Sequence, residues 1–172
     1  MRSEAVRSSL FRTEISQIDD EGDLQVGRAL GYSGEELDRV HIVRQHGLAS
    51  HAPKGSHGIG VAGSGERSLV AVLGLESPGK RPRGLKEGQT VLYDASGNAT
   101  RMLGDDGVWH DAGSRPHKLT GKTITLTGTD RVEVEVGSMR VVVTAGRVDL
   151  GGEGGSPVMT QAGPSSKVFA LT

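Results

Sequence analysis

The most regular pattern in the chain is an alternation of apolar and polar residues between Thr120 and Gly152. The apolar residues fall at every second position in four short runs: Ile124 and Leu126; Val132, Val134 and Val136; Met139, Val141 and Val143; Val148 and Leu150. Successive side chains of a strand point to opposite faces, so each run predicts a short strand with one apolar side. The other side is predicted to face water: Thr123, Thr125, Thr127, Arg131, Glu133, Glu135, Arg140, Thr144, Arg147 and Asp149.

The runs recur roughly every eight or nine residues, mostly with a glycine between them. One coil of a single-chain β-solenoid needs about 20 residues or more, so this architecture is excluded. Two arrangements remain open. One is an ordinary antiparallel sheet in a globular domain. The other is three copies wound around a common axis, which closes the apolar face and removes exposed sheet edges.

Shorter apolar runs fill the first eighty residues and indicate β-structure without a long helix. The predicted strands are Leu10–Ile18, Leu24–Tyr32, Val40–Gly47, Ile59–Gly65 and Arg67–Ser77. A turn is expected at Asp19–Asp23, and a loop or one helical turn at Ser33–Asp38. This count of short strands fits a small closed barrel of the OB type.

A linker rich in Pro, Gly and basic residues, Ser77–Gly88, follows the barrel and marks the best domain boundary. Two short strands around the turn Asp94–Asn98 and a third around Val108–Trp109 are expected next. The predicted organisation is an N-terminal arm at 1–9, a barrel at 10–78, a neck at 79–107, a β-shaft at 108–152 and a tip at 153–172.

Composition supports thin, repetitive β-structure. Of 172 residues, 27 are Gly and only 3% are aromatic, whereas aromatic rings normally fill much of a globular core. The absence of Cys excludes disulfides and thiolate metal sites and fits assembly in a reducing cytosol. The net charge of -1 gives no global case for nucleic acid. No run reaches a membrane span of about 18 residues, and no signal-peptide core begins the chain, so a soluble, non-secreted protein is expected.

Two motifs resemble ligand sites but have a simpler interpretation. Gly58, Gly60 and Gly63 match G-x-G-x-x-G, yet an apolar β-run follows where a phosphate site needs a helix, so close strand packing is favoured. The histidines lack the spacing and partners of a zinc site, and metal binding is not expected at any of them: His41, His46, His51, His57, His110 and His117.

The charged clusters are also weak candidates. Asp19, Asp20, Glu21 and Asp23 lack the twelve-residue calcium-loop pattern and fit a solvated turn. Single-strand-binding barrels combine a basic groove with aromatic platforms. The basic run is Lys80, Arg81, Arg83 and Lys86, while Phe11, Tyr32 and Tyr93 are scattered. Asn98–Thr100 fits a glycosylation sequon that a non-secreted chain would not use. No acid/base pair or nucleophile arrangement for catalysis stands out.

Several segments together resemble a known family, the Mu-like phage baseplate spike proteins, also called baseplate assembly protein V. The loop HGLASHAPKGSHG resembles the family's barrel. The junction RPRGLKEGQTVLYDASGN resembles its step from barrel into spike, through Gly84, Leu85, Gly88, Leu92, Tyr93 and Asp94. VDLGGEGGSPVM and SSKVFA resemble its C-terminal region, so the matches cover most of residues 45–172.

The resemblance implies an all-β homotrimer with an N-terminal OB-fold barrel, an intertwined triple-stranded β-helix and a pointed tip. Its partners would be tail hub and baseplate proteins and, transiently, the host outer membrane, with no nucleic acid. It implies a part of the virion at the tail baseplate tip, assembled in host cytoplasm, which punctures the membrane when the sheath contracts. The trimer core would be the ten apolar residues of the shaft, from Ile124 to Leu150.

One departure concerns the apex, where some relatives hold iron through a His-x-His pair on each chain. Residues 151–172 contain no His, so no such iron and no other cofactor is expected. The tip is expected to close by apolar packing or by a folded-back strand, through Pro157, Val158, Met159, Val168, Phe169 and Leu171. The alternatives to a spike are an OB-fold protein that binds single-stranded nucleic acid and a tail-associated lysin.

Overall fold

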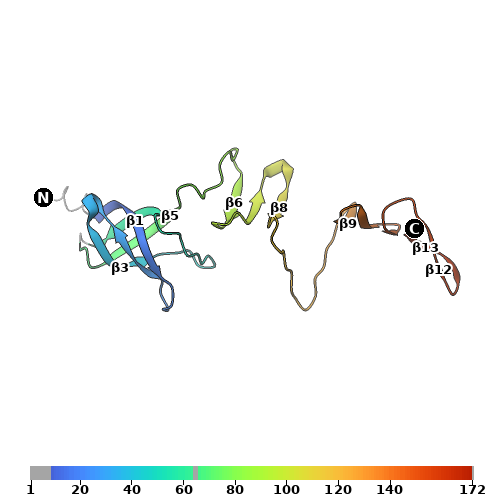
Figure 1. The fold of residues 1–172 in the computed structure, drawn as a ribbon, viewed down its shortest axis with the longest axis horizontal. Helices are drawn as coiled ribbons and strands as arrows, with labels where there is room; N and C mark the ends of the chain where they lie inside the picture. Colours follow the sequence, from blue (N-terminus) through green and yellow to red (C-terminus); the bar gives the residue numbers. More distant parts are fainter. Residues whose placement is uncertain (1–8, 64–65, 172) are drawn as a thin grey trace. The chain divides into compact units, whose positions relative to one another are not determined.

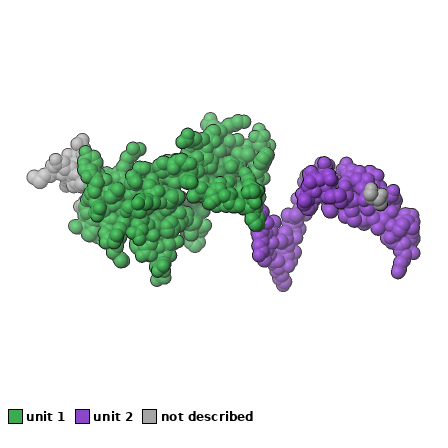
Figure 2. Space-filling view, viewed as in Figure 1, with its two compact units in different colours: residues 1–116 green, residues 117–172 purple. Residues whose placement is uncertain are grey.

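The structure is a computed structural model that describes residues 9–63 and 66–171, so the predicted N-terminal arm lies almost entirely outside the described residues. With 47% strand and 5% helix it is all-β, as predicted. The chain divides into two compact units, residues 1–116 and residues 117–172 (Figure 2). The first unit contains a barrel and a small sheet, and the second contains a single five-stranded sheet.

Five strands close into the predicted barrel in the order β1-β2-β3-β5-β4 (Figure 1). They are β1 (Leu10–Asp19), β2 (Val26–Leu30), β3 (Glu36–Ile42), β4 (His57–Ala62) and β5 (Val70–Glu76). Neighbouring strands are antiparallel except β3 and β5, which pair in parallel. A short 3-10 helix, η1 (Tyr32–Gly34), connects β2 to β3.

The barrel interior is filled by small aliphatic side chains. The buried members are Ile15, Ile18, Ala29, Leu37, Val40, Ile42, Ala62, Val70 and Val72. Phe11 packs against them from a partly buried position. The buried hydroxyl of Thr13 donates to the carbonyl of Leu30 at 2.9 Å, so it is not left unsatisfied. A low aromatic content is therefore sufficient for this narrow core.

The start of β3 was predicted wrongly. The expected strand began at Val40 and followed a loop or helical turn at Ser33–Asp38, whereas β3 begins at Glu36. Arg39 adopts a left-handed φ of 55°, and the register with β2 shifts at this position. This bulge lets Leu37 and Val40, three residues apart, both point into the core. Simple alternation cannot reveal such a strand.

Three short strands after the barrel form an antiparallel sheet in the order β6-β7-β8. They are β6 (Thr90–Tyr93), β7 (Ala99–Met102) and β8 (Val108–Asp111), with the 3-10 helix η3 (Gly104–Asp106) before β8. Asp94 stabilises the β6–β7 turn by accepting hydrogen bonds from the backbone N–H groups of Ser96 (2.8 Å) and Asn98 (3.0 Å). All three predicted strands are confirmed.

The second unit holds the sheet with the order β12-β13-β11-β10-β9. Its strands are β9 (Arg131–Val136), β10 (Met139–Thr144), β11 (Val148–Leu150), β12 (Ser156–Thr160) and β13 (Gly163–Ala170). β11 and β13 pair in parallel, and the other neighbours are antiparallel. The C-terminal strand therefore folds back along the middle of the sheet.

The strand predicted at Ile124 and Leu126 is not formed. Residues 117–130 contain no strand, and both side chains are more than half exposed. The local sequence alternates as a strand does, but a strand also needs a neighbour to accept and donate its backbone hydrogen bonds. Within the described residues, no strand pairs with residues 118–130, so the alternation alone does not create a strand.

Candidate assembly surface

One face of the second sheet gathers the predicted core residues of the shaft. In the register of β9 with β10, Val134 lies opposite Val141 and Val132 lies opposite Val143. β11 continues the same rows, because Val141 also faces Leu150 and Val143 also faces Val148. Met139 and Val136 complete the face as a pair beside the β9–β10 turn. We call these eight residues, Val132 to Leu150, the apolar face.

The apolar face is not covered by its own chain. Val136 is 78% exposed, Met139 62% and Val134 57%. Val141, Val143 and Leu150 are also exposed, and Val132 and Val148 are half-buried. Single exposed apolar side chains are common on protein surfaces, but a contiguous patch marks an interaction surface. The sequence pattern thus predicts a surface that the described residues of the second unit leave uncovered.

The opposite face of the same sheet is charged. Arg140 pairs with Glu133 (3.5 Å) and Glu135 (3.8 Å), and Arg131 pairs with Glu133 and with Glu153 (3.6 Å). These groups are largely exposed, and such ion pairs each contribute about 1 kcal/mol or less. They mark the part of this face on β9 and the start of β10 as contacting water, as predicted for Arg131, Glu133, Glu135 and Arg140.

Asp149 departs from that prediction, because it is buried rather than facing water. Its exposure is 1%, and it lies between Val142, which is fully buried, and Phe169 in the cross-strand rows. Arg147 donates to both carboxylate oxygens, with Nε at 3.0 Å from Oδ1 and 2.9 Å from Oδ2. The same guanidinium lies 3.9 Å above the centre of the Phe169 ring.

The Arg147, Asp149 and Phe169 cluster joins the returning strand β13 to β11. The hydrogen bond to Asp149 is the main reason that the pKa of Arg147 lies above its ordinary value. A buried carboxylate is tolerated only when paired and hydrogen-bonded. Sequence reasoning missed the cluster because Phe169 lies far along the chain from Asp149. The one available signal was an Arg-x-Asp pair at the end of an apolar run.

The predicted tip residues occupy β12 and β13. Val158, Val168 and Phe169 are half-buried, whereas Met159 is 71% exposed. Leu171 follows β13, and its backbone N–H donates to the carbonyl of Leu150 at 2.9 Å. It also lies against Gly151, where a Cβ atom would come within 3.3 Å of the Leu171 Cβ and where φ is +88°. Glycine at 151 therefore permits this close return of the chain.

The G-x-G-x-x-G motif serves strand packing in the barrel, as expected. Gly58 and Gly60 lie on β4 and face the interior. A Cβ atom on Gly60 would lie 2.5 Å from Cζ of Phe11, so the ring occupies the space of the missing side chain. The described residues that follow the motif, 66–69, contain no helix.

The sequence of the barrel also matches a known protein family. Residues 12–79 match the family model of Bacteriophage Mu Gp45, N-terminal. The resemblance to Mu-like baseplate spike proteins is thus confirmed over the barrel. A search of curated proteins found no match. The Mu Gp45 family indicates a structural protein of the phage baseplate, located in the virion tail, and fits a protein that is not an enzyme.

The remaining candidate residues of the Mu Gp45-like barrel are dispersed. His41 and His57 lie on β3 and β4, while His46 and His51 lie in the connection between these strands. In the described part of the chain, no group of three or more His, Asp or Glu side chains is placed to hold a metal. The acidic residues Asp19–Asp23 form the end of β1 and the β1–β2 turn, as predicted.

Among the rings, Tyr93 lies beside the basic run, where it lines a pocket with Lys80 and Arg83, whereas Phe11 has a packing role in the barrel. Phe11 packs on Gly60 and the core, and the guanidinium of Arg67 covers its other side at 4.0 Å from the ring centre. Arg67 is held in turn by Glu35 at 3.2 Å. Among the residues that the structure describes, no helix is long and apolar enough to cross a membrane.

Proposed function

We propose that the chain is one subunit of a homotrimeric spike at the centre of a contractile-tail baseplate. In this proposal the spike closes the end of the tail tube and punctures the host outer membrane when the sheath contracts. The observation that carries the proposal is the exposed apolar face on β9, β10 and β11. The Mu Gp45 match of the barrel supplies the baseplate context.

Three copies of the chain can bury the apolar face, which a single copy leaves exposed. Six of its side chains are exposed. Complete burial of such a side chain contributes roughly 1.5–3 kcal/mol, so covering these partly exposed groups gives about 5 kcal/mol per chain. Three such faces around one axis form a closed core, and the charged faces remain outside in water. An intertwined triple-stranded β-helix has this arrangement.

The segment at residues 118–130, which forms no strand, supports the same arrangement. Ile124 and Leu126 alternate with threonines, but their backbone has no strand partner among the residues that the structure describes. In a trimer, a neighbouring chain supplies that partner, and the two side chains join the core. Every backbone group of a closed β-helix is then paired, so many hydrogen bonds and a continuous apolar core share an axial load.

The nucleic-acid-binding alternative has less support. Single-strand binding needs exposed aromatic platforms beside a basic groove. Tyr93 supplies one ring beside Lys80 and Arg83, but Phe11 packs against Gly60 and beneath Arg67, and the whole chain carries a net charge of -1. We also propose that the apex holds no His-ligated iron. Elemental analysis of the purified protein tests this, because iron in stoichiometric amount would contradict it.

Electron microscopy of contractile-tail particles tests the proposed location. An antibody raised against residues 153–172 is expected to label the distal end of the baseplate in particles with an extended sheath. Labelling along the tube or sheath contradicts the proposal. A titration of the protein with labelled single-stranded DNA at several salt concentrations tests the alternative, which predicts salt-sensitive binding.

A further inference from the structure

A basic groove lies on the outside of the barrel, where β1, β4 and β5 meet the linker. Its volume is about 580 Å³, and its lining includes Arg12, His57, Ile59, Pro78, Arg81 and Arg83. Arg12 and Ile59 are direct cross-strand neighbours on β1 and β4. Arg81 is paired with Glu76 at 3.0 Å, but Arg12 and Arg83 form no ion pair within the described residues. The groove therefore presents unpaired positive charge beside an apolar floor.

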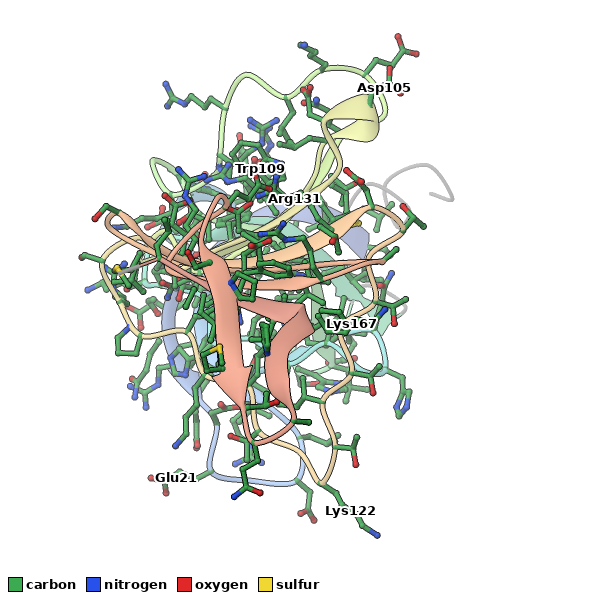
Figure 3. All side chains as sticks on the ribbon, turned by 90° about the vertical axis from the view of Figure 1, so that its right-hand side faces the viewer. Glu21, Asp105, Trp109, Lys122, Arg131 and Lys167 are labelled. Carbon is green, nitrogen blue, oxygen red and sulfur yellow. The ribbon has the colours of Figure 1, made fainter. Side chains whose placement is uncertain are left out.

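The opposite charge is concentrated in the β1–β2 turn of the same barrel. Asp19, Asp20, Glu21 and Asp23 fall within five residues, and Figure 3 shows Glu21 extending away from the ribbon at the turn. Asp19 accepts the backbone N–H of Glu21, and Asp20 accepts the side-chain amide of Gln25. Arg44 lies near enough to Asp20 to interact with it electrostatically. Within the described ranges 9–63 and 66–171, no Lys or Arg forms an ion pair with Asp19, Glu21 or Asp23, and none lies within 4.0 Å of Asp20. We call residues 19–23 the acidic turn.

One barrel cannot bring the acidic turn to its own groove. Arg12 and Asp19 lie on the same strand, seven residues apart. At about 3.3 Å per strand residue they are separated by roughly 23 Å. A neighbouring copy has no such constraint. Contact between two different surfaces of identical chains is heterologous, and it closes into a ring when a rotation axis relates the copies.

We infer that the acidic turn of each subunit docks into the basic groove of the next subunit around the three-fold axis. This inference rests on the proposed homotrimer and adds a second contact, separate from the apolar face. Exposed ion pairs contribute little to affinity but fix orientation and partner choice. The role of the contact is therefore to set the rotation of the barrels about the axis and to join them in a collar.

A nucleic acid is the less favoured occupant of the same groove. The described lining of the groove contains no Phe, Tyr or Trp, so His57 is its one ring for stacking on a base. The acidic turn, in contrast, is present once per subunit, as the groove is. Any ring of identical chains contains equal numbers of acidic turns and basic grooves, and the two carry opposite charge.

Disulfide trapping in the full chain tests the inference, since the natural sequence contains no Cys. Gly22→Cys in the acidic turn and Pro78→Cys on the groove rim leave every charge in place. A Cβ atom on Gly22 meets only the carbonyl oxygen of Leu24, at 3.6 Å, and needs no rearrangement. Oxidation with diamide is expected to link the double variant into covalent trimers. Either single variant alone is expected to remain unlinked.

Charge reversal separates docking from chance collision. Arg12→Glu with Arg83→Glu, added to the cysteine pair, is expected to slow trapping about ten-fold, because two rim pairs become repulsive. Adding Glu21→Lys and Asp23→Lys is expected to restore it. These four positions lie outside the apolar face, so sedimentation should show trimers in every variant.

The outcomes separate a failure of the proposed trimeric spike from a failure of the proposed docking. A wild-type monomer in sedimentation contradicts the proposed spike itself. A wild-type trimer whose cysteine pair forms no links, or links at a rate that charge reversal leaves unchanged, overturns the docking of the acidic turn while leaving the spike intact. Salt-dependent binding of labelled single-stranded DNA, lost in the Arg12→Glu and Arg83→Glu variant, would assign the groove to nucleic acid instead.

Discussion

The substitution Val134→Asp tests whether the apolar face is the inside of an assembly. Val134 lies in the middle of β9, is 57% exposed in the single chain and faces Val141 across the strands. In a monomer the new carboxylate would stand in water and change little. In the proposed trimer, three carboxylates would meet near one axis without a cation.

The expected magnitude is large in the trimer. Removing a charge from water without a partner costs several kcal/mol per ion. Three ions therefore cost on the order of 10 kcal/mol or more per trimer, added to the lost apolar contacts. This is comparable with the total that we assign to covering the apolar face. The variant is expected to sediment as a monomer at neutral pH.

The pH dependence of the variant has a definite sign. Burial and mutual repulsion disfavour the charged form of Asp, so its pKa in the trimer would lie above the value in the monomer. Assembly of the variant is therefore favoured at pH values below the pKa of the free carboxyl group and is lost as the pH rises through the higher pKa of the trimer. Partial return of the trimer in acid is expected for Val134→Asp, whereas Val134→Asn should show no such dependence.

Two controls make the result interpretable. Glu135→Gln changes charge at the next residue of the same strand, on the charged face, and should leave the trimer intact. Val134→Asn introduces polarity without charge and should weaken assembly less than Asp does. A Val134→Asp protein that sediments as a trimer as stable as the wild type at neutral pH would refute the burial of this face.

Three further perturbations address the parts of the fold separately. Asp149→Asn removes the buried carboxylate that pairs with the partly exposed Arg147. It should reduce the free energy of unfolding by about 2 kcal/mol in thermal or denaturant melts, whereas Glu135→Gln on the exposed face should cost below about 0.5 kcal/mol. Gly60→Ala should destabilise the barrel by about 1–3 kcal/mol, because the Phe11 ring fills the space that the new Cβ atom needs. Gly63→Ala should be nearly neutral, because a Cβ atom there meets nothing within 4 Å. Equal effects of the two variants would contradict the packing role of Gly60. Hydrogen bonds, first from the Asn98 side chain, hold the pKa of Asp94 below its ordinary value of 3.8. Asp94 should therefore support the β6–β7 turn as the pH falls through 3.8, and this support should be lost only at lower pH. The NMR shifts of the Ser96 and Asn98 amides follow the turn, and loss of the turn at higher pH would argue against this.

Where regular alternation governed the structure, the sequence was sufficient. The barrel strands other than β3, the three strands after the linker and the runs from Val132 to Leu150 follow the two-residue period and are confirmed as strands. The same period places eight apolar residues on one face of the second sheet. Alternation is a property of each strand by itself, so it can be recognised in the sequence without knowing which strands are neighbours in the sheet.

The errors occurred where the structure depends on distant residues or on local backbone irregularity. Arg39 in a left-handed conformation moves the start of β3 and breaks the alternation. Asp149 is buried because Arg147 and Phe169 cover it, and Phe169 arrives from a strand twenty residues later. Ile124 has the correct local pattern but no partner in its own chain. None of these facts is encoded in a window of neighbouring residues.

The mass of the full-length protein in solution tests the central claim most directly. Sedimentation equilibrium over a wide range of concentration is expected to give three times the 18.0 kDa mass of the chain, without dissociation in high salt. Insensitivity to salt is expected because the apolar face, rather than the exposed ion pairs, holds the assembly. A single species of 18.0 kDa at all concentrations would leave the apolar face exposed to water and would contradict the account.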